Sequence, residues 1–243
     1  MALGGIAWGW QRFGVRTPQP GFVAIEGLPG WRRVEYEGVS LSGGSATSAV
    51  LVGIGEPEPS LDPLPTSALC DALYGSQFGL SLPVAMFSDF FCPYCREVSA
   101  RIAARAADPA SKLSLTWHEL PLLSPSSELA AKAALAADLQ GGYADFQARL
   151  FATPFRPSPA HLASTAEAVG LDAGKLISDM DGAQVAQRLT NTRRAAETLG
   201  IWATPAMTIG RTLVTGAVSD AALSSIIADE RDRSDGFRSD CSA

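Results

Sequence analysis

Hydrophobic and polar residues alternate in two different ways along the middle of the chain. Residues 80–91, LSLPVAMFSDFF, are almost continuously apolar without a helical period, which predicts a buried strand. Residues 112–120, KLSLTWHEL, alternate between apolar and polar, which predicts a second strand. Between them, Val98, Ile102 and Ala106 recur at spacings of four and predict a helix. The order in this part is therefore strand, helix, strand.

A series of alanine-rich helical segments follows, and turn residues separate its members. The pattern places these helices at about residues 127–140, 143–151, 158–169, 172–180 and 183–199. Two short strands, AMTIG and TLVTG, come next on either side of Arg211, and a final helix is expected at about 219–229. A block of helices therefore interrupts an α/β pattern.

The first 65 residues are rich in glycine and proline. Residues 31–41 and 47–55 alternate as strands do, and SGGS at 42–45 is a turn sequence, so we expect these strands to form a hairpin. Residues 55–65 hold four prolines and predict an extended linker, because each proline removes a backbone donor and disfavours helix before it. A short helix is expected at 66–74.

These patterns divide the chain into five parts. They are an N-terminal extension with its proline-rich linker at 1–65, the first part of an α/β domain at 66–125, a helical insertion at 126–199, the second part of the α/β domain at 200–230, and a polar tail at 231–243.

The composition indicates a globular protein rather than a disordered or nucleic-acid-binding one. Of the 243 residues 47% are hydrophobic and 18% are charged, and the formal net charge is -6. No apolar run reaches the roughly 18 residues that would span a bilayer. The apolar beginning, MALGGIAWGW, fits either the remainder of a trimmed signal or membrane anchor, or an ordinary terminus.

The stretch FFCPYCREVS places Cys92 and Cys95 one helical turn apart, where the predicted strand leads into the predicted helix. Backbone N–H groups at a helix start carry partial positive charge, so they lower the pKa of a nearby thiol below the usual value of about 8.5. Cys95 can then reach the first sulfur and resolve a mixed disulfide. Pro93 and Tyr94 fix the turn between them. The spacing favours a redox pair.

Two other interpretations of the cysteine pair are weaker. Zinc sites take three or four protein ligands, whereas the chain has no second close cysteine pair and only His118 and His161 as histidines, so no metal site is predicted. A purely structural disulfide across two residues would close a very short loop and add little stability.

Two further features bear on the site and on stability. In GIWATPAMTIG, a proline directly precedes a strand, and a cis peptide between Thr204 and Pro205 would hold an extended edge facing the sulfurs. Cys70 and Cys241 remain. Bridged, they would close a loop of about 170 residues and stabilise the fold by roughly 4 to 5 kcal/mol; otherwise Cys70 is a core residue and Cys241 a free thiol.

Three motifs together resemble a known family. FSDFFCPYC, HELPLLSPSSELAAKAALAA at 118–137 and GIWATPAMTIG, in this order with the helical insertion between them, are similar to the DsbA-like bacterial thiol:disulfide oxidoreductases over about residues 80–230. The resemblance implies an α/β, thioredoxin-like fold with a central mixed sheet and an inserted all-helical domain. The hairpin would be an N-terminal extension of it.

The resemblance also implies roles for individual residues. Cys92 matches the nucleophile, Cys95 the resolving cysteine, Pro93 and Tyr94 the tuning dipeptide, and Thr204 with Pro205 the loop beside the active site. The implied activity is transfer of a disulfide to cysteine-containing substrate proteins, with a membrane or soluble redox partner that resets the dithiol. No cofactor beyond the redox-active disulfide is implied. The expected location is periplasmic or otherwise extracytoplasmic, with an N-terminal membrane anchor left open.

The chain also departs from the family pattern. Related proteins often carry a buried acid six residues before the first cysteine, where this chain has Met86. Asp89 is the nearest acid, and if it faces away, water or Glu119 must accept the proton of Cys95. Three alternative functions stay open: a reductase or isomerase of the same fold, a dithiol module that binds a soft metal such as copper, and a glutathione-dependent transferase or isomerase.

Overall fold

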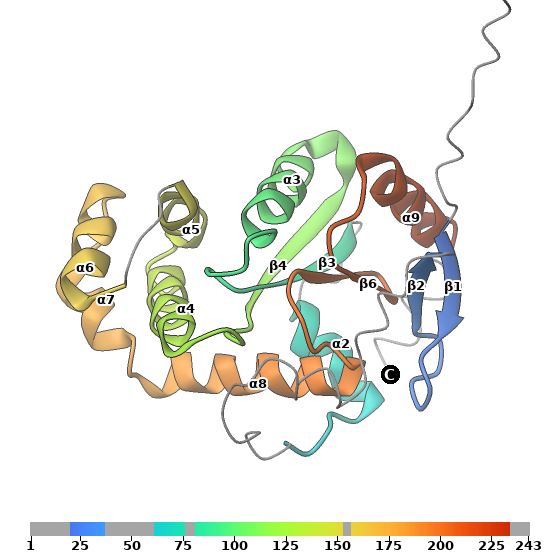
Figure 1. Ribbon diagram of the computed structural model, residues 1–243, viewed down its shortest axis with the longest axis horizontal. Helices are drawn as coiled ribbons and strands as arrows, with labels where there is room; N and C mark the ends of the chain where they lie inside the picture. The colour runs from blue at the N-terminus through green and yellow to red at the C-terminus, as the bar shows by residue number, and fades with distance from the viewer. Residues whose placement is uncertain (1–19, 37–60, 76–80, 153–156, 234–243) are drawn as a thin grey trace, which may run out of the picture.

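A mixed β-sheet forms the centre of the protein, and helices cover both of its faces (Figure 1). The computed structural model describes residues 20–36, 61–75, 81–152 and 157–233. Within these residues the sheet has six strands in the order β1-β2-β6-β5-β3-β4. The strands are β1 (Pro20–Ala24), β2 (Arg32–Tyr36), β3 (Leu82–Ser88), β4 (Leu113–Glu119), β5 (Ala206–Ile209) and β6 (Thr212–Thr215). The α/β prediction with a central mixed sheet is confirmed.

The strand that precedes the cysteines lies inside the sheet. β3 pairs in parallel with β4 and antiparallel with β5, and each of its residues is buried. Burial on both faces explains why its sequence is continuously apolar instead of alternating. The strand thus provides a rigid support for the loop that follows it.

Two pairs of helices sandwich the sheet, and side chains of β3 alternate between them. The helices α3 and α9 lie on one face, while α2 and α8 lie on the other (Figure 1). Met86 packs on the α3 and α9 side, whereas Phe87 packs on the α2 and α8 side. The bounds are α2 (Thr66–Tyr74), α3 (Cys95–Ala107), α8 (Ala183–Leu199) and α9 (Asp220–Asp232), with a short 3₁₀ turn η1 (Pro109–Ser111) after α3.

The helical insertion forms a second layer beside the cysteine motif. Its apolar core includes Cys92 and Cys95 together with alanines of α4, and the rings of Phe90 and Phe151 lie 4.9 Å apart. The motif therefore sits where the sheet meets the insertion. The helices are α4 (Pro125–Asp138), α5 (Tyr143–Ala152), α6 (Pro159–Ala168) and α7 (Ala173–Asp179), followed by α8.

An N-terminal hairpin is present, and its second strand, β2, falls within the predicted strand at 31–41. β2 pairs antiparallel with β1 on one side and, through Arg32 and Arg33, in parallel with β6 on the other. The short connection between β1 and β2 holds Gly27 and Gly30, both at positive φ, which favours a tight hairpin. The predicted turn at 42–45 and the strand at 47–55 lie outside the described residues.

The end of the predicted linker is tied to α8. Backbone N–H groups of Leu61 and Leu64 donate to side chains of Glu197 and Thr198, each at 2.8 Å. Pro65 has extended backbone angles, as expected before a helix. The segment from 61 to 65 therefore runs along α8 rather than away from the domain.

Cys70 lies buried on α2, in the core beside Leu69 and Leu73. Its proposed partner, Cys241, lies outside the described residues, so the disulfide between them stays a prediction. Among the helices of the described residues, none combines the length and apolar character needed to cross a membrane.

Candidate active site

The two cysteines occupy the turn between β3 and α3. The helix begins at Cys95, so Cys92 lies three residues before it, and the N–H of Cys95 donates to the carbonyl of Cys92 at 3.2 Å. Both are free thiols, with Cys92 5% exposed and Cys95 fully buried. Only the first sulfur is therefore open to an incoming group.

The loop before β5 lies against the first sulfur. The peptide between Thr204 and Pro205 is cis, and the Sγ of Cys92 lies 3.2 Å from the carbonyl oxygen of Thr204. The structure thus brings together residues 112 positions apart in the sequence. In the thiol form Cys92 donates to this carbonyl, whereas the side chain of Thr204 stabilises the thiolate.

The surroundings of the two sulfurs shift their pKa values in opposite directions. A hydrogen bond from Cys95 lowers the pKa of Cys92 to about 6, assisted by Thr204 and by the backbone N–H groups of Tyr94 and Cys95, while burial acts against them. The pKa of Cys95 is raised well above its ordinary value, because the Cys92 sulfur holds its proton and because it is buried. At neutral pH the pair is a Cys92 thiolate beside a Cys95 thiol.

A pH titration of the reduced protein should show this asymmetry. The ultraviolet absorbance of the thiolate should rise with a midpoint near pH 6, because that is the pKa of Cys92. Since this pKa lies below the ordinary thiol value, the stability that ionisation gives the reduced fold is complete above that ordinary value and is lost as pH falls through 6. Cys95→Ala should shift the midpoint upward, and a wild-type midpoint near about 8.5 would contradict the assignment.

Asp89 organises the loops around the site instead of facing away from them. Its buried carboxylate accepts hydrogen bonds from three backbone N–H groups, those of Phe91 at 2.7 Å, Leu122 at 2.9 Å and Leu123 at 3.1 Å. These bonds join the turn before Cys92 to the loop after β4. Sequence reasoning did not anticipate this role, although an Asp two residues before a turn N–H is a common local motif.

A second buried acid, Glu119, ends β4. Tyr143 of α5 donates a hydrogen bond to its Oε1, and Gln147 donates to the Tyr143 oxygen at 2.8 Å. Burial raises the pKa of Glu119 to about 8, although the bond from Tyr143 opposes the rise. Tyr143 and Gln147 were not predicted, because only their spacing of four on a helix places them on one face.

Large apolar side chains are exposed on the loops that hold the cysteines and on the loops that pack beside them. Of the six that are exposed among the described residues, five lie on the loops that form the site, and we call these five the apolar rim. The rim consists of Phe91, Tyr94, Leu122, Leu123 and Trp202. Tyr94 and Trp202 are the most exposed, at 61% and 59%. Exposed apolar patches of this kind mark binding surfaces.

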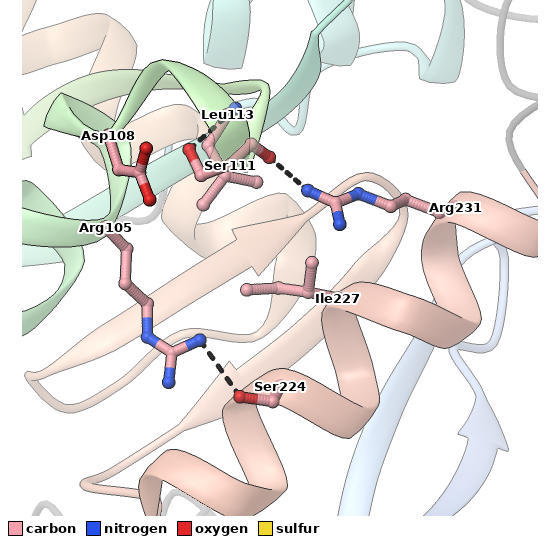
Figure 2. A pocket seen from close by; sticks show the side chains of 7 residues that line it. All are labelled: Arg105, Asp108, Ser111, Leu113, Ser224, Ile227 and Arg231. Atoms are coloured by element: carbon pink, nitrogen blue, oxygen red, sulfur yellow. Dashed lines mark hydrogen bonds between the residues drawn. The ribbon is translucent and has the colours of Figure 1, made fainter.

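A surface cavity lies away from the cysteines. It lies between the end of α3, η1 and α9 (Figure 2) and has a volume of about 270 Å³. The two arginines that line this cavity already make hydrogen bonds within the protein. Arg105 donates to Ser224 at 3.0 Å, and Arg231 donates to the carbonyl of Ser111. None of its lining residues belongs to the cysteine motif. In the part of the chain that the structure describes, no three His, Cys, Asp or Glu residues gather as metal ligands.

Fold and site together define a thioredoxin-like protein with a helical insertion and an active-site dithiol. Residues 83–228 match the family model of the DSBA-like thioredoxin domain. The chain belongs to this family of thiol:disulfide oxidoreductases, as the three sequence motifs predicted.

Solved structures and curated proteins give further similarities. A thioredoxin-like oxidoreductase from Silicibacter pomeroyi is 29% identical, with a TM-score of 0.61 over 67% of this chain and 97% of its own. The thiol-disulfide exchange protein alpha-DsbA2 from Wolbachia pipientis, 21% identical, has a TM-score of 0.59 over 67% and 94% of the two chains and supports the fold. The Na(+)/H(+) antiporter NhaA 3 of Salinispora tropica is 29% identical over 146 residues, 59% of this chain. The chain matches only 22% of the length of that antiporter.

Proposed function

We propose that this protein transfers disulfides to cysteine-containing substrate proteins through Cys92 and Cys95. One observation carries the proposal: the only partly accessible sulfur of the pair has a lowered pKa and touches the Thr204 carbonyl, while its partner sulfur lies buried directly behind it. This is the arrangement that a nucleophile and a resolving thiol require.

The reaction begins with the oxidised pair. A substrate thiolate attacks the Sγ of Cys92, the Cys92–Cys95 bond breaks, and Cys95 leaves with the electron pair and takes up a proton. A second substrate thiolate then attacks the substrate sulfur of the mixed disulfide, so the substrate gains a disulfide and Cys92 departs as a thiolate. The lowered pKa of Cys92 makes it a good leaving group, which favours the oxidising direction.

The apolar rim supports protein substrates. Its five side chains expose aromatic and aliphatic surface on the loops next to the cysteines, which suits an unfolded chain that still exposes apolar residues beside its cysteines. A redox partner must re-oxidise the dithiol after each turnover, and no cofactor is needed because the sulfurs carry the electrons. An extracytoplasmic location fits this chemistry, since disulfides persist in oxidising compartments.

Two measurements test the proposal. The oxidised protein should restore activity to a reduced, unfolded model enzyme whose native state needs disulfides, and equilibration with glutathione should give a potential nearer to about -120 mV than to about -270 mV. A potential near the lower value would assign the reducing direction instead. No exchange with any protein thiol would contradict the function altogether.

A further inference from the structure

Glu119 lies on the same side of the sheet as the resolving cysteine. It pairs directly with Ser88 in the parallel ladder of β4 and β3, and directly paired residues point to the same face. Met86, two residues before Ser88, packs against Val98 and Ile102 of α3 on that face. Glu119 therefore points toward the layer between the sheet and α3.

The chain topology also brings Glu119 and Cys95 to the same end of that layer. β3 and β4 are parallel, so their carboxyl ends, at Ser88 and Glu119, lie at one edge of the sheet. α3 connects these strands and starts at the same edge, with Cys95 in its first turn. The backbone of Asp89, the residue after Ser88, is a hydrogen-bond partner of the Cys95 sulfur.

The buried polar atoms near this end are not all paired. In the described residues, Glu119 Oε2, Ser88 Oγ and Ser99 Oγ are buried without a hydrogen-bond partner. Ser99 follows Cys95 by four residues, so the two share one face of α3. Burial of a carboxyl oxygen without a hydrogen-bond partner costs free energy and disfavours the fold. A functional role would explain why the protein keeps such an atom.

We propose that Glu119 exchanges a proton with Cys95 during catalysis, with Tyr143 and Gln147 holding its carboxyl in place. This inference rests on the function proposed above. Cys95 needs such a partner because its thiol is buried and its proton is tightly held. One carboxyl oxygen of Glu119 is fixed by Tyr143, which leaves the other oxygen available for the proton.

The proton moves between Glu119 and Cys95 in both halves of the reaction cycle. When substrate attacks Cys92, the Cys92–Cys95 bond breaks and protonated Glu119 gives its proton to the departing Cys95 thiolate. When the dithiol is reset, the Cys92 thiolate attacks a disulfide of the redox partner, which acts as the oxidant; the partner's S–S bond breaks, one of its sulfurs leaves as a thiolate, and the other stays in a mixed disulfide with Cys92 while the Glu119 carboxylate takes the proton of Cys95. Cys95 then attacks the Cys92 sulfur, and the oxidant leaves as a thiolate.

Several charged groups set the pH at which Glu119 changes state. The nearby Asp89 carboxylate raises its pKa, whereas Tyr143 and Arg188 lower it, and burial is the largest influence. Arg188 is itself paired with Asp138 at 2.6 Å. The net result is a pKa of about 8, so both forms of the carboxyl are accessible near neutral pH.

The two sulfurs can be followed separately with one equivalent of a chromogenic aryl disulfide. The Cys92 thiolate should release one coloured thiolate in a fast first phase, and Cys95 should release the second as it displaces the aryl group. In the wild type the second phase should accelerate as pH rises through about 8, because the carboxylate form of Glu119 is the base. Glu119→Gln should slow this phase about a hundredfold and remove the inflection, with the first phase unchanged.

Two variants separate this role from a structural one. Glu128→Gln, which changes an exposed acid of α4, should leave both phases unchanged. Tyr143→Phe keeps the carboxyl but removes a group that lowers its pKa, so the inflection should move upward. If Glu119→Gln does not fold, the Tyr143→Phe variant tests the role of Glu119 by itself. An unchanged second phase in Glu119→Gln, or an unmoved inflection in Tyr143→Phe, would overturn the inference. A wild type without a second phase would instead contradict the proposed function.

Discussion

Cys92→Ser should abolish disulfide transfer to a reduced model protein, with a loss of more than about a thousandfold, because a serine hydroxyl does not ionise near neutral pH. The remaining thiol cannot substitute for it. Cys95 is fully buried, so an incoming substrate cannot reach its sulfur, and burial alone still raises the pKa of its thiol and disfavours the nucleophilic thiolate. The measurement is the rate at which the reduced protein acquires disulfides, compared at equal concentrations of folded variant and wild type.

Cys95→Ser is the matched control for this prediction. It retains the nucleophile but lacks the resolving thiol, so mixed disulfides between Cys92 and substrate should accumulate and be visible on non-reducing gels. The difference between the two serine variants assigns the roles. Turnover by Cys92→Ser at the wild-type rate, or mixed disulfides formed by that variant, would exclude Cys92 as the nucleophile.

Much of the fold follows from local periodicity. The α/β core and the inserted helices were predicted because each element is long or strongly patterned, and their bounds agree with the structure to within a few residues. Strand β1, which pairs with β2 in the hairpin, was not predicted, for a physical reason. The segment 20–24 is short and contains a proline and a glycine, so its strand pattern is weak. The pairing of β2 with β6 joins strands that are distant in the sequence, and local periodicity does not reveal such a pair.

The site was predictable only where its residues adjoin the motifs. Cys92, Cys95, Thr204 and Pro205 stand within recognisable stretches, and the structure places them together. The roles of Asp89 and Tyr143 depend on contacts with residues 24 to 34 positions away, which no spacing rule reveals. Trp202, three residues before Pro205, is 59% exposed and belongs to the apolar rim.

Arg32→Ala should destabilise the whole domain by about 3 to 5 kcal/mol, although Arg32 lies far from the cysteines in the sequence. Its guanidinium pairs with the buried carboxylate of Glu230 at 2.8 Å, donates to Thr212 at 2.7 Å and lies 3.8 Å from the centre of the Phe22 ring. Removing it leaves Glu230 buried without its closest positive charge. Against a typical total stability of about 5 to 15 kcal/mol, urea unfolding should show a large fall in the midpoint.

Arg33→Ala provides the matched control, since Arg33 is the next residue of β2 and is exposed. It should change stability by less than about 0.5 kcal/mol. Adding Glu230→Gln to Arg32→Ala should recover part of the loss, because the neutral amide no longer leaves a charge buried. If Arg32→Ala unfolds at the wild-type urea concentration, the hairpin is dispensable to the domain. If it unfolds early and Arg33→Ala does not, the strands that precede the linker are an integral part of the sheet that supports the cysteines.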